Sequence, residues 1–435
     1  MASSPPAGGL TTAEVAQILG IKRQTVYAYV SRGILHRQMA LDGRTSLFDR
    51  AEVEELRLGR RPEQDGELRT MLTTRLTRVA DDGVWIRGRD LVELVDGGAG
   101  FREVADLVWD SADDETWPGA DAPPPVDPSP VVDTSDDGSL LAQLQVLVAA
   151  EASRDPLRHD LSARSVRAAG RRAVTAMATG LRTGRSPGPD ATGPRSQGQG
   201  PLDETAIGRR LWAGLTDHPV DPGRLRAVDV ALALLVDHGL AASTLAARIA
   251  ASVRADPYSV IAAGLGVLGG PLHGAASGGV HELYRAAERE GDAAAAVGHL
   301  QRRGVPVPGF GHAIYRTQDP RYGVLMTHIV EGWAADPRLG TVFRVRDVLG
   351  ERSDAIPNVD LALGALTFLA GMPAAAGEAL FAIARTAGWL AHAMEEYEEK
   401  PLRFRPRARY IGPRPESDRA GAPGAAAPRR DGDAG

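Results

Sequence analysis

The sequence predicts an all-α protein in which a small helix-turn-helix domain precedes a much larger helical domain. Residues 204–400 are rich in Ala and Leu, contain few runs of β-branched residues, and are interrupted by Gly or Pro, which is the pattern of packed helices. Residues 10–60 form a separate module with its own helical spacing. The chain has 435 residues, enough for two or three domains with one large core.

The composition excludes several classes of protein. There is no Cys, which excludes a disulfide scaffold, a Cys-ligated zinc and a thiol nucleophile. The net charge is −6, so any contact with DNA must be local. The histidines form no metal-binding i, i+4 pair, and no metal site is expected. No long apolar run or signal-peptide pattern occurs, so we expect a soluble, cytoplasmic protein without a membrane segment.

The first module reads as two helices followed by a hairpin. Thr11 or Thr12 can cap a helix that has Glu14 in its first turn and Val15, Ile18 and Leu19 at helical spacing. Gly20 makes the turn, and residues 21–30 form the second helix. Asp-Gly in residues 41–44 favours a hairpin turn, and residues 50–58 supply a closing helix.

The segment AEVAQILGIKRQTVYAYVSRGIL resembles the winged helix-turn-helix of the MerR and excisionase families. In that arrangement the second helix faces the major groove of DNA. Residues 1–61 hold 9 basic and 6 acidic side chains, a local net charge of 9 − 6 = +3. The residues that would contact DNA are Lys22, Arg23, Gln24 and Tyr27. The alternative is that this module is a structural appendage of the large domain.

The rest of the chain reads as one large domain, residues 69–413, joined to the first module by a linker at 61–68. Its beginning predicts a short extended piece and then two helices. Two Pro- and Gly-rich stretches, 118–138 and 184–203, read as exposed insertions. The tail, 414–435, is expected to be disordered.

Four candidate catalytic residues lie beside helix breaks. They are His238, His273, His312 and Asp360, and each is next to a Gly or Pro break in the helical pattern. Polar groups at helix ends can face a cleft whose walls are apolar helix bodies. Pro271 suits a first helical turn, which would place a neutral His273 near a helix N-terminus. Asp360 precedes an apolar run, so its carboxylate could act as a desolvated base.

The blocks PLHG, GFGHAIYRTQDPRY and PNVD, in this order, resemble the three signature blocks of the citrate synthase family. GVWIRGRDLVEL with FREVADLVW resembles the family's N-terminal block, and IARTAGWLAHAMEE with RPRARYIGP resembles its C-terminal blocks. The resemblance covers roughly residues 70–413 and implies a helical fold of a large and a small lobe. It also implies condensation of acetyl-CoA with oxaloacetate, followed by hydrolysis of the thioester to citrate and CoA.

The resemblance implies a role for each matching residue. Asp360 would take the proton from the acetyl methyl group, His273 would hydrogen-bond the thioester oxygen, and His312 would polarise the ketone of oxaloacetate. Oxaloacetate would be bound by His238, Arg321, Arg385 and Arg405, the last from the partner subunit of a homodimer. CoA would lie along Arg316 and the backbone of Val307, Gly309 and Gly311. Acetyl-CoA is thus a co-substrate, and no tightly bound cofactor is expected.

One block departs from the family pattern. The family usually reads Asp-His-Glu-Leu-Asn-Ala-Ser where this chain has Gly239 and Ala241 in place of Glu and Asn. This loss of polar groups beside the substrate favours the second of two alternatives to a citrate synthase. One is a 2-methylcitrate synthase that uses propionyl-CoA, since one methylene is discriminated weakly. The other is a ligand-responsive DNA-binding regulator whose citrate-synthase-like domain is degenerate.

Overall fold

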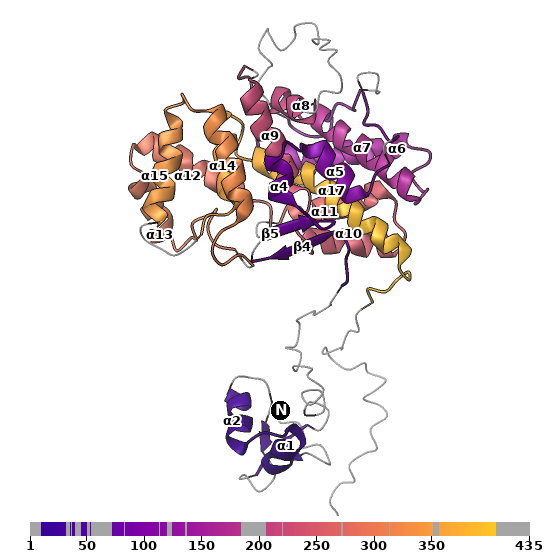
Figure 1. Ribbon diagram of the computed structural model, residues 1–435, viewed down its shortest axis with the longest axis vertical. Helices are drawn as coiled ribbons and strands as arrows, with labels where there is room; N and C mark the ends of the chain where they lie inside the picture. Colours follow the sequence, from indigo (N-terminus) through magenta and orange to yellow (C-terminus); the bar gives the residue numbers. More distant parts are fainter. Residues whose placement is uncertain are drawn as a thin grey trace, which may run out of the picture. The chain divides into compact units, whose positions relative to one another are not determined.

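The computed structural model divides into two units, Met1–Thr73 and Thr74–Gly435 (Figure 1). The predicted linker, the second predicted insertion and the tail fall outside the described residues, as do the turn at 41–44 and all but one residue of the closing helix. The structure describes residues 10–31, 35, 37–39, 45–49, 53, 72–81, 83–112, 114–119, 124–134, 137–183, 206–219, 221–270, 273–312, 314–350 and 356–405.

The N-terminal unit has the helix-turn-helix fold that the sequence predicts. Its elements are β1 (Leu10–Thr11), α1 (Thr12–Leu19), α2 (Arg23–Ser31), β2 (Arg37–Met39) and β3 (Ser46–Phe48), and the strands form an antiparallel sheet in the order β1-β3-β2.

Local sequence signals explain the start and the end of α1. Thr11 is the N-cap: its hydroxyl accepts from the backbone N–H of Glu14, whose carboxylate accepts from the N–H of Thr11 in return. Gly20 ends the helix at φ 65°, a left-handed conformation that suits glycine. Val15 and Val26 are fully buried and pack the two helices together.

The larger unit begins with a small sheet, where the sequence predicted only a short extended piece. β4 (Thr77–Ala80), β5 (Gly83–Ile86) and β6 (Arg89–Asp90) pair in that order, all antiparallel. The two predicted helices follow as α4 (Leu91–Asp96) and α5 (Phe101–Trp109). Asp90 caps α4 by accepting from the backbone N–H groups of Val92 and Glu93.

The remaining helices form two groups (Figure 1). One group packs around α17 together with α5, and it consists of α6 (Leu140–Arg154), α7 (Ala163–Gly180), α8 (Ala206–Leu215), α9 (Pro222–Leu235), α10 (Ala242–Ser252), α11 (Pro257–Leu268) and α17 (Ala376–Glu398). The other group packs around α12 and α16, and it consists of α12 (Ala276–Glu290), α13 (Ala293–Arg302), α14 (Pro320–Gly332), α15 (Arg338–Gly350) and α16 (Val359–Leu369).

Three helices are apolar on nearly all sides and form the centre of the unit. In α9, every residue from Ala227 to Leu235 is buried. In α16, every residue from Leu361 to Leu369 is buried, and most of α17 is buried as well. A helix without a polar face lies inside the protein. Most of the polar residues of interest are therefore found near the ends of buried helices, with Arg385 inside α17 as the exception.

Candidate active site

The candidate residues meet where the two groups of helices face each other. His238 and Arg385 come from the first group: His238 follows α9, and Arg385 lies within α17. The others come from the second group, as turns or first turns next to its helices. They are His273, three residues before α12, His312, between α13 and α14, Arg321, in the first turn of α14, and Asp360, in the first turn of α16.

His238 and His312 form an aromatic cluster with Tyr315. The rings of the two histidines are perpendicular, with centroids 5.3 Å apart. The hydroxyl of Tyr315 lies 2.9 Å from Nε2 of His238, and the Tyr315 ring lies 4.4 Å from that of His312. Tyr315 is almost fully buried, and it contacts both imidazole rings, which fixes their positions.

The backbone fixes which nitrogen of His312 carries its proton. Nδ1 accepts from the backbone N–H groups of Ile314 and Tyr315, at 3.0 and 3.1 Å. A nitrogen that accepts hydrogen bonds is unprotonated, so the proton of a neutral His312 is on Nε2. Nε2–H is therefore the group that His312 can offer to a ligand.

In His273 the two ring nitrogens have the opposite roles to those in His312. Its Nε2 accepts from the backbone N–H of Ser243 at 3.4 Å, which leaves the proton of the neutral ring on Nδ1. The ring also meets Phe381 of α17 edge to face, with centroids 6.1 Å apart. α12 begins at Ala276, so His273 precedes the helix and is not in its first turn; Pro271 lies outside the described residues.

An ion pair joins the first turns of α14 and α16. The guanidinium of Arg321 donates to both carboxylate oxygens of Asp319, through Nε at 3.0 Å and Nη2 at 2.9 Å. The same carboxylate accepts from the backbone N–H of Val359, the residue before Asp360. Arg321 and Asp319 are both buried. Asp319, which the sequence analysis missed, thereby fixes Arg321 and Asp360 relative to each other.

Arg385 is a buried cation that makes no direct ion pair with a carboxylate of the described residues, although Asp237 and Asp360 lie near enough to raise its pKa electrostatically. Its Nε donates to the carbonyl of Leu235 at 2.9 Å, and its guanidinium lies 4.5 Å from the centre of the Phe381 ring. Burial lowers the pKa of Arg385 to about 10. A buried charge is costly unless it is paired, so this site favours an anionic ligand.

The electrostatic surroundings keep the imidazoles neutral and the carboxyl group basic. Burial lowers the pKa of His238, His273 and His312, and the nearby arginines lower each further. Burial raises the pKa of Asp360 to about 6, against the opposing effect of Arg321. The candidate site thus combines three imidazoles whose neutral forms are favoured with a carboxylate that is a stronger base than usual.

The glycine-rich loop at 307–311 is tied to the segment that leads to Asp360. The carbonyl of Gly309 accepts from the N–H of Asn358, and the carbonyl of Gly311 accepts from the Asn358 side chain at 2.9 Å. Gly309 has φ 83°, and a Cβ there would lie 2.9 Å from Cβ of Leu361. Only glycine fits this position, so the loop and α16 are held in close contact.

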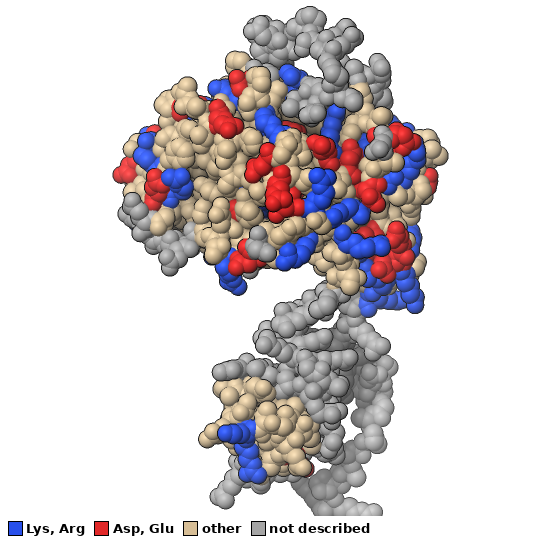
Figure 2. All heavy atoms as spheres, viewed as in Figure 1, with Lys and Arg blue, Asp and Glu red and all other residues tan. Residues whose placement is uncertain are grey.

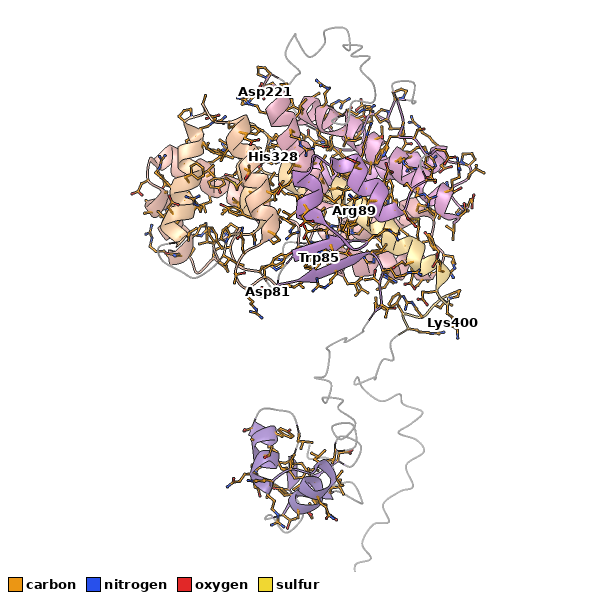
Figure 3. All side chains as sticks on the ribbon, viewed as in Figure 1. Asp81, Trp85, Arg89, Asp221, His328 and Lys400 are labelled. Carbon is orange, nitrogen blue, oxygen red and sulfur yellow. The ribbon has the colours of Figure 1, made fainter. Side chains whose placement is uncertain are left out.

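Arg316 and Arg405 are both exposed. The backbone N–H of Arg316 donates to Asp81, at the turn of the β4–β5 hairpin (Figure 3), at 2.6 Å. Arg405 lies in the segment after α17, where the N–H of Leu402 donates to the carbonyl of Ser252. Within the described residues, Arg405 makes no contact with the other candidate residues of its own chain.

The turn that carries His238 rests on a buried network that the sequence analysis also missed. Asp237 accepts from the hydroxyl of Thr77 and from the N–H of Gly239. Nε2 of His392 lies 3.4 Å from the Asp237 carboxylate, and Nδ1 of His392 accepts from Arg248. Gly388 lets this turn lie directly on α17, because a Cβ there would be 2.4 Å from the carbonyl of Val236.

The two departures from the family pattern lie in this same turn. Gly239 has φ 71°, which a side chain would strain. Ala241 occupies the N-cap position of α10 and has no side-chain hydrogen bond there. Replacement of a capping side chain by alanine removes a hydrogen bond from the helix end.

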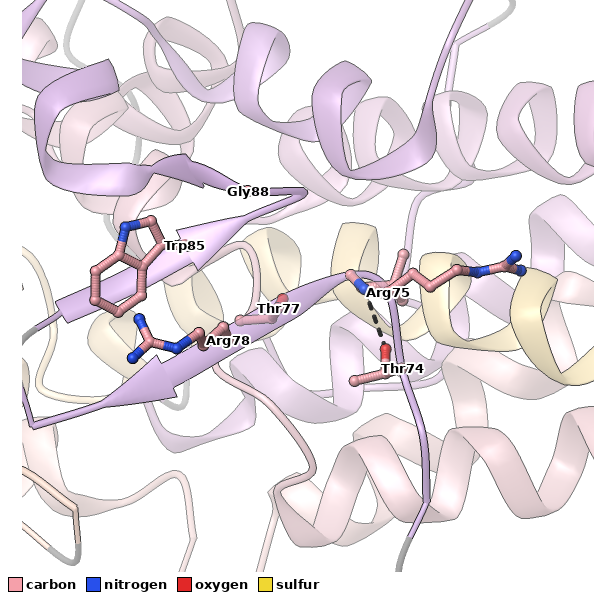
Figure 4. Close-up of a pocket in the computed structure, with 7 residues that line it drawn as sticks. Thr74, Arg75, Thr77, Arg78, Trp85 and Gly88 are labelled. Atoms are coloured by element: carbon pink, nitrogen blue, oxygen red, sulfur yellow. Dashed lines mark hydrogen bonds between the residues drawn. The ribbon is translucent and has the colours of Figure 1, made fainter.

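Two cavities in the described part of the chain are lined by residues other than the candidate residues. The one in Figure 4 has a volume of about 310 Å³ and is lined by residues of the β4–β5 hairpin and the segment before it, with Arg78 above the ring of Trp85 at 4.2 Å. The other, of about 500 Å³, lies between α12 and the loop at 371–375. No group of metal-ligating side chains occurs within the described ranges. No described helix is long and apolar enough to cross a membrane.

The exposed surface of α2 carries the predicted DNA contacts. Lys22, Arg23 and Gln24 are exposed, and Tyr27 is 52% exposed. Arg23 and Tyr27 are one helical turn apart, so they share one side of the helix. Figure 2 shows basic side chains gathered on the described surface of this unit.

The citrate synthase family model, described as "Citrate synthase, C-terminal domain", matches residues 68–407. The chain belongs to the citrate synthase family. A helix-turn-helix family model matches residues 10–61, which confirms the predicted fold of the first module. The relatives of this chain include proteins named citrate synthase and one named 2-methylcitrate synthase, which are the two reactions that the sequence suggested.

Citrate synthase of Haloferax volcanii is 35% identical over 188 residues, or 42% of this chain and 49% of that protein. 2-Methylcitrate synthase 2 of Corynebacterium glutamicum is 34% identical over 200 residues, or 44% and 51%. The chain thus spans about half the length of the curated relatives it matches. The ternary complex of the Thermoplasma acidophilum citrate synthase with carboxymethyl coenzyme A and oxaloacetate has the same fold, with 22% identity, a TM-score of 0.57, and coverage of 80% and 95%.

Proposed function

We propose that this chain condenses acetyl-CoA with oxaloacetate to give citrate and CoA. The observation that carries the proposal is that Asp360, with its raised pKa, and the three histidines each have one or both of the same buried arginines, Arg321 and Arg385, as electrostatic neighbours. The Haloferax and Thermoplasma proteins named above support it by family membership.

Oxaloacetate is a dianion with a reactive ketone, and it fits the cationic end of the site. Arg385 and Arg321 would bind its two carboxylates, with Arg385 offering the Nη groups that no described residue engages. His238, held by Tyr315, would add a neutral hydrogen bond. Nε2–H of His312 would polarise the ketone and then donate its proton to the new alkoxide.

Enolisation of acetyl-CoA needs a base and an oxyanion donor at the same time. Asp360 would remove a proton from the acetyl methyl group, while Nδ1–H of His273 hydrogen-bonds the thioester oxygen. The enol carbon then attacks the ketone, and water hydrolyses the resulting thioester. Closure of the two groups of helices over the substrates would shield the enol from water.

CoA would lie along the loop at 307–311. This loop is fixed to the segment before Asp360 by the hydrogen bonds of Gly309 and Gly311 with Asn358. The resemblance assigns the backbone of Val307, Gly309 and Gly311 to CoA, and Arg316 to a phosphate. Arg316 is exposed, as a phosphate contact at the mouth of a site requires.

Propionyl-CoA is the second candidate acyl donor. A relative named 2-methylcitrate synthase matches this chain almost as well as the Haloferax citrate synthase does. One methylene is worth only about 1–3 kcal/mol in an apolar pocket. The kcat/KM values for acetyl-CoA and propionyl-CoA, measured at saturating oxaloacetate, decide between them. A ratio above ten in favour of propionyl-CoA would make 2-methylcitrate the product.

A homodimer would complete the site. The outward positions of α10 and α11 carry no charged residue. On α10 the outward residues include Leu245 and Ile249, and Ile249 is 44% exposed. Val253, directly after α10, is 56% exposed. An outer helix face normally carries charges, and a continuous exposed apolar surface marks an interface. The segment that leads to Arg405 runs beside this surface, at Leu402. Arg405 would then reach the oxaloacetate site of the partner.

The pH dependence of catalysis should follow Asp360. Because the base acts when ionised and its pKa is about 6, kcat/KM should rise about tenfold per pH unit below pH 6 and level off above it. The pKa values of the three histidines are lowered, which favours their neutral forms as the pH rises through this range. Initial rates between pH 5 and 8 in a constant-ionic-strength buffer check this. A profile that is flat through pH 6 would contradict the role of Asp360.

We also propose that the N-terminal unit binds DNA. Lys22 and Arg23 would contact phosphates, and Gln24 or Tyr27 would reach base edges. Affinity for a genomic fragment should fall steeply with salt, and Lys22→Ala with Arg23→Ala should flatten that salt dependence. Lys400→Ala, a basic-to-alanine change in the larger unit, is the matched control. Loss of activity or thermal stability on deletion of residues 1–61, without DNA binding at low salt, would favour the structural appendage instead.

A further inference from the structure

One carboxyl group beside the catalytic histidines has no part in the mechanism above. Glu378 lies in the first turn of α17 and is partly buried. It makes no hydrogen bond or ion pair with any described residue, and burial raises its pKa. A carboxyl group that loses water without gaining a partner is costly, which suggests that a ligand supplies the missing partner.

Glu378 is close to the residue that follows His273. A Cβ placed on Gly274 would lie 2.7 Å from Oε1 and 3.1 Å from Cγ of Glu378. The absence of a side chain at Gly274 is what allows the carboxyl group to approach the backbone there. The side chain of Glu378 therefore borders the same turn that presents His273 to the substrate.

The order of contacts along α17 shows on which side of His273 this carboxyl group lies. Glu378, Phe381 and Arg385 are spaced at i, i+3 and i+7, so they share one face of the helix. Arg385 contacts Phe381, Phe381 contacts His273, and Glu378 contacts Gly274. Seven residues of helix rise about 10 Å. Glu378 is therefore about 10 Å from Arg385 along the helix axis, with Phe381 and its contact to His273 between them.

We propose that Glu378 accepts a hydrogen bond from the pantetheine arm of acyl-CoA. This proposal rests on the proposed function, in which His273 bonds the thioester oxygen and Arg385 binds oxaloacetate. On that assignment, Glu378 lies on the side of His273 away from Arg385, which is the side left for the thioester sulfur and the arm attached to it. In CoA, two methylenes separate that sulfur from an amide N–H, which needs an acceptor when it is buried. Glu378 is a positioning residue that sets the affinity for the acyl-CoA arm.

Two probes separate the arm from the rest of CoA. CoA contains the pantetheine arm, and adenosine 3′,5′-bisphosphate is its nucleotide part without the arm. In calorimetric titrations, Glu378→Ala should weaken CoA binding about tenfold and leave binding of the bisphosphate unchanged. Glu378→Gln retains an acceptor oxygen and should stay within about twofold of the wild type. Glu282→Ala, at an exposed glutamate on α12, is the matched control and should change neither.

Equal effects of Glu378→Ala on both probes, or no effect on CoA, would overturn the proposal. In the active enzyme the same variant should raise KM for acetyl-CoA about tenfold and leave KM for oxaloacetate unchanged. A shift in both KM values would indicate a merely structural role. The binding measurements need no turnover, so they test Glu378 separately from the activity. If the wild type binds CoA through Glu378 but is inactive, the proposed condensation is refuted and the role of Glu378 in CoA binding stands.

Discussion

The Asp360→Ala protein should be folded and almost inactive. Asp360 is the carboxylate with a raised pKa among the residues that meet at the site, and a positioned base contributes about 10²–10⁴-fold to the rate. Its side chain makes no hydrogen bond with any residue that the structure describes, and the contact that joins α14 and α16 runs through Asp319 and the N–H of Val359. The loss should therefore fall on kcat, and binding of oxaloacetate should persist.

Asp360→Asn is the companion variant, since it keeps the shape and removes the base. Above pH 6 the ionised Asp360 is a desolvated charge, so replacing it with a neutral amide should not lower the melting temperature there. Initial rates and thermal melts of both variants at pH 8 test these statements together. Turnover within tenfold of the wild type in either variant would remove Asp360 from the role of base.

Mixed Asp360→Ala and Arg405→Ala proteins should regain the activity that each lacks alone. Arg405 is exposed and makes no described contact with the site of its own chain, while its segment runs beside the uncharged surface of α10. In a hybrid dimer, one of the two sites holds a wild-type Asp360 together with a wild-type Arg405 from the partner.

The mixing experiment requires proof of subunit exchange, for example by native mass spectrometry of differently tagged chains. Activity should rise to about a quarter of the wild-type value per mole of chain when the two proteins exchange at random in equal amounts. Arg385→Ala mixed with Asp360→Ala is the control: both residues act within one chain, so no hybrid site contains both and activity should stay low. If the subunits exchange and activity does not recover, Arg405 does not act in the partner's site.

Local signals in the sequence were enough to predict most elements of the fold. The capping box of Thr11 and Glu14, the left-handed Gly20 and the apolar runs of α9 and α16 are each read within one stretch of chain. The signature blocks also gave the candidate site residues, whose catalytic roles stay a prediction. Arg321 and Asp360 lie in the first turns of α14 and α16, and His238 follows the buried helix α9.

The contacts that orient these residues could not be predicted, since they join distant parts of the chain. The Asp237 and His392 pair links the end of α9 to α17, and Asp319 links the caps of α14 and α16. The tautomers of His273 and His312 depend on backbone N–H groups whose positions a pattern does not give.

Release of free CoA is the measurement that tests the proposed function most directly. The purified protein is incubated with acetyl-CoA in the presence and absence of oxaloacetate, and the free thiol is followed with time. We predict thiol release that depends on oxaloacetate, yields citrate in equal amount, and disappears in Asp360→Asn. Absence of release with acetyl-CoA and with propionyl-CoA, from a folded protein that binds oxaloacetate, would contradict the account and favour a regulator that has lost turnover.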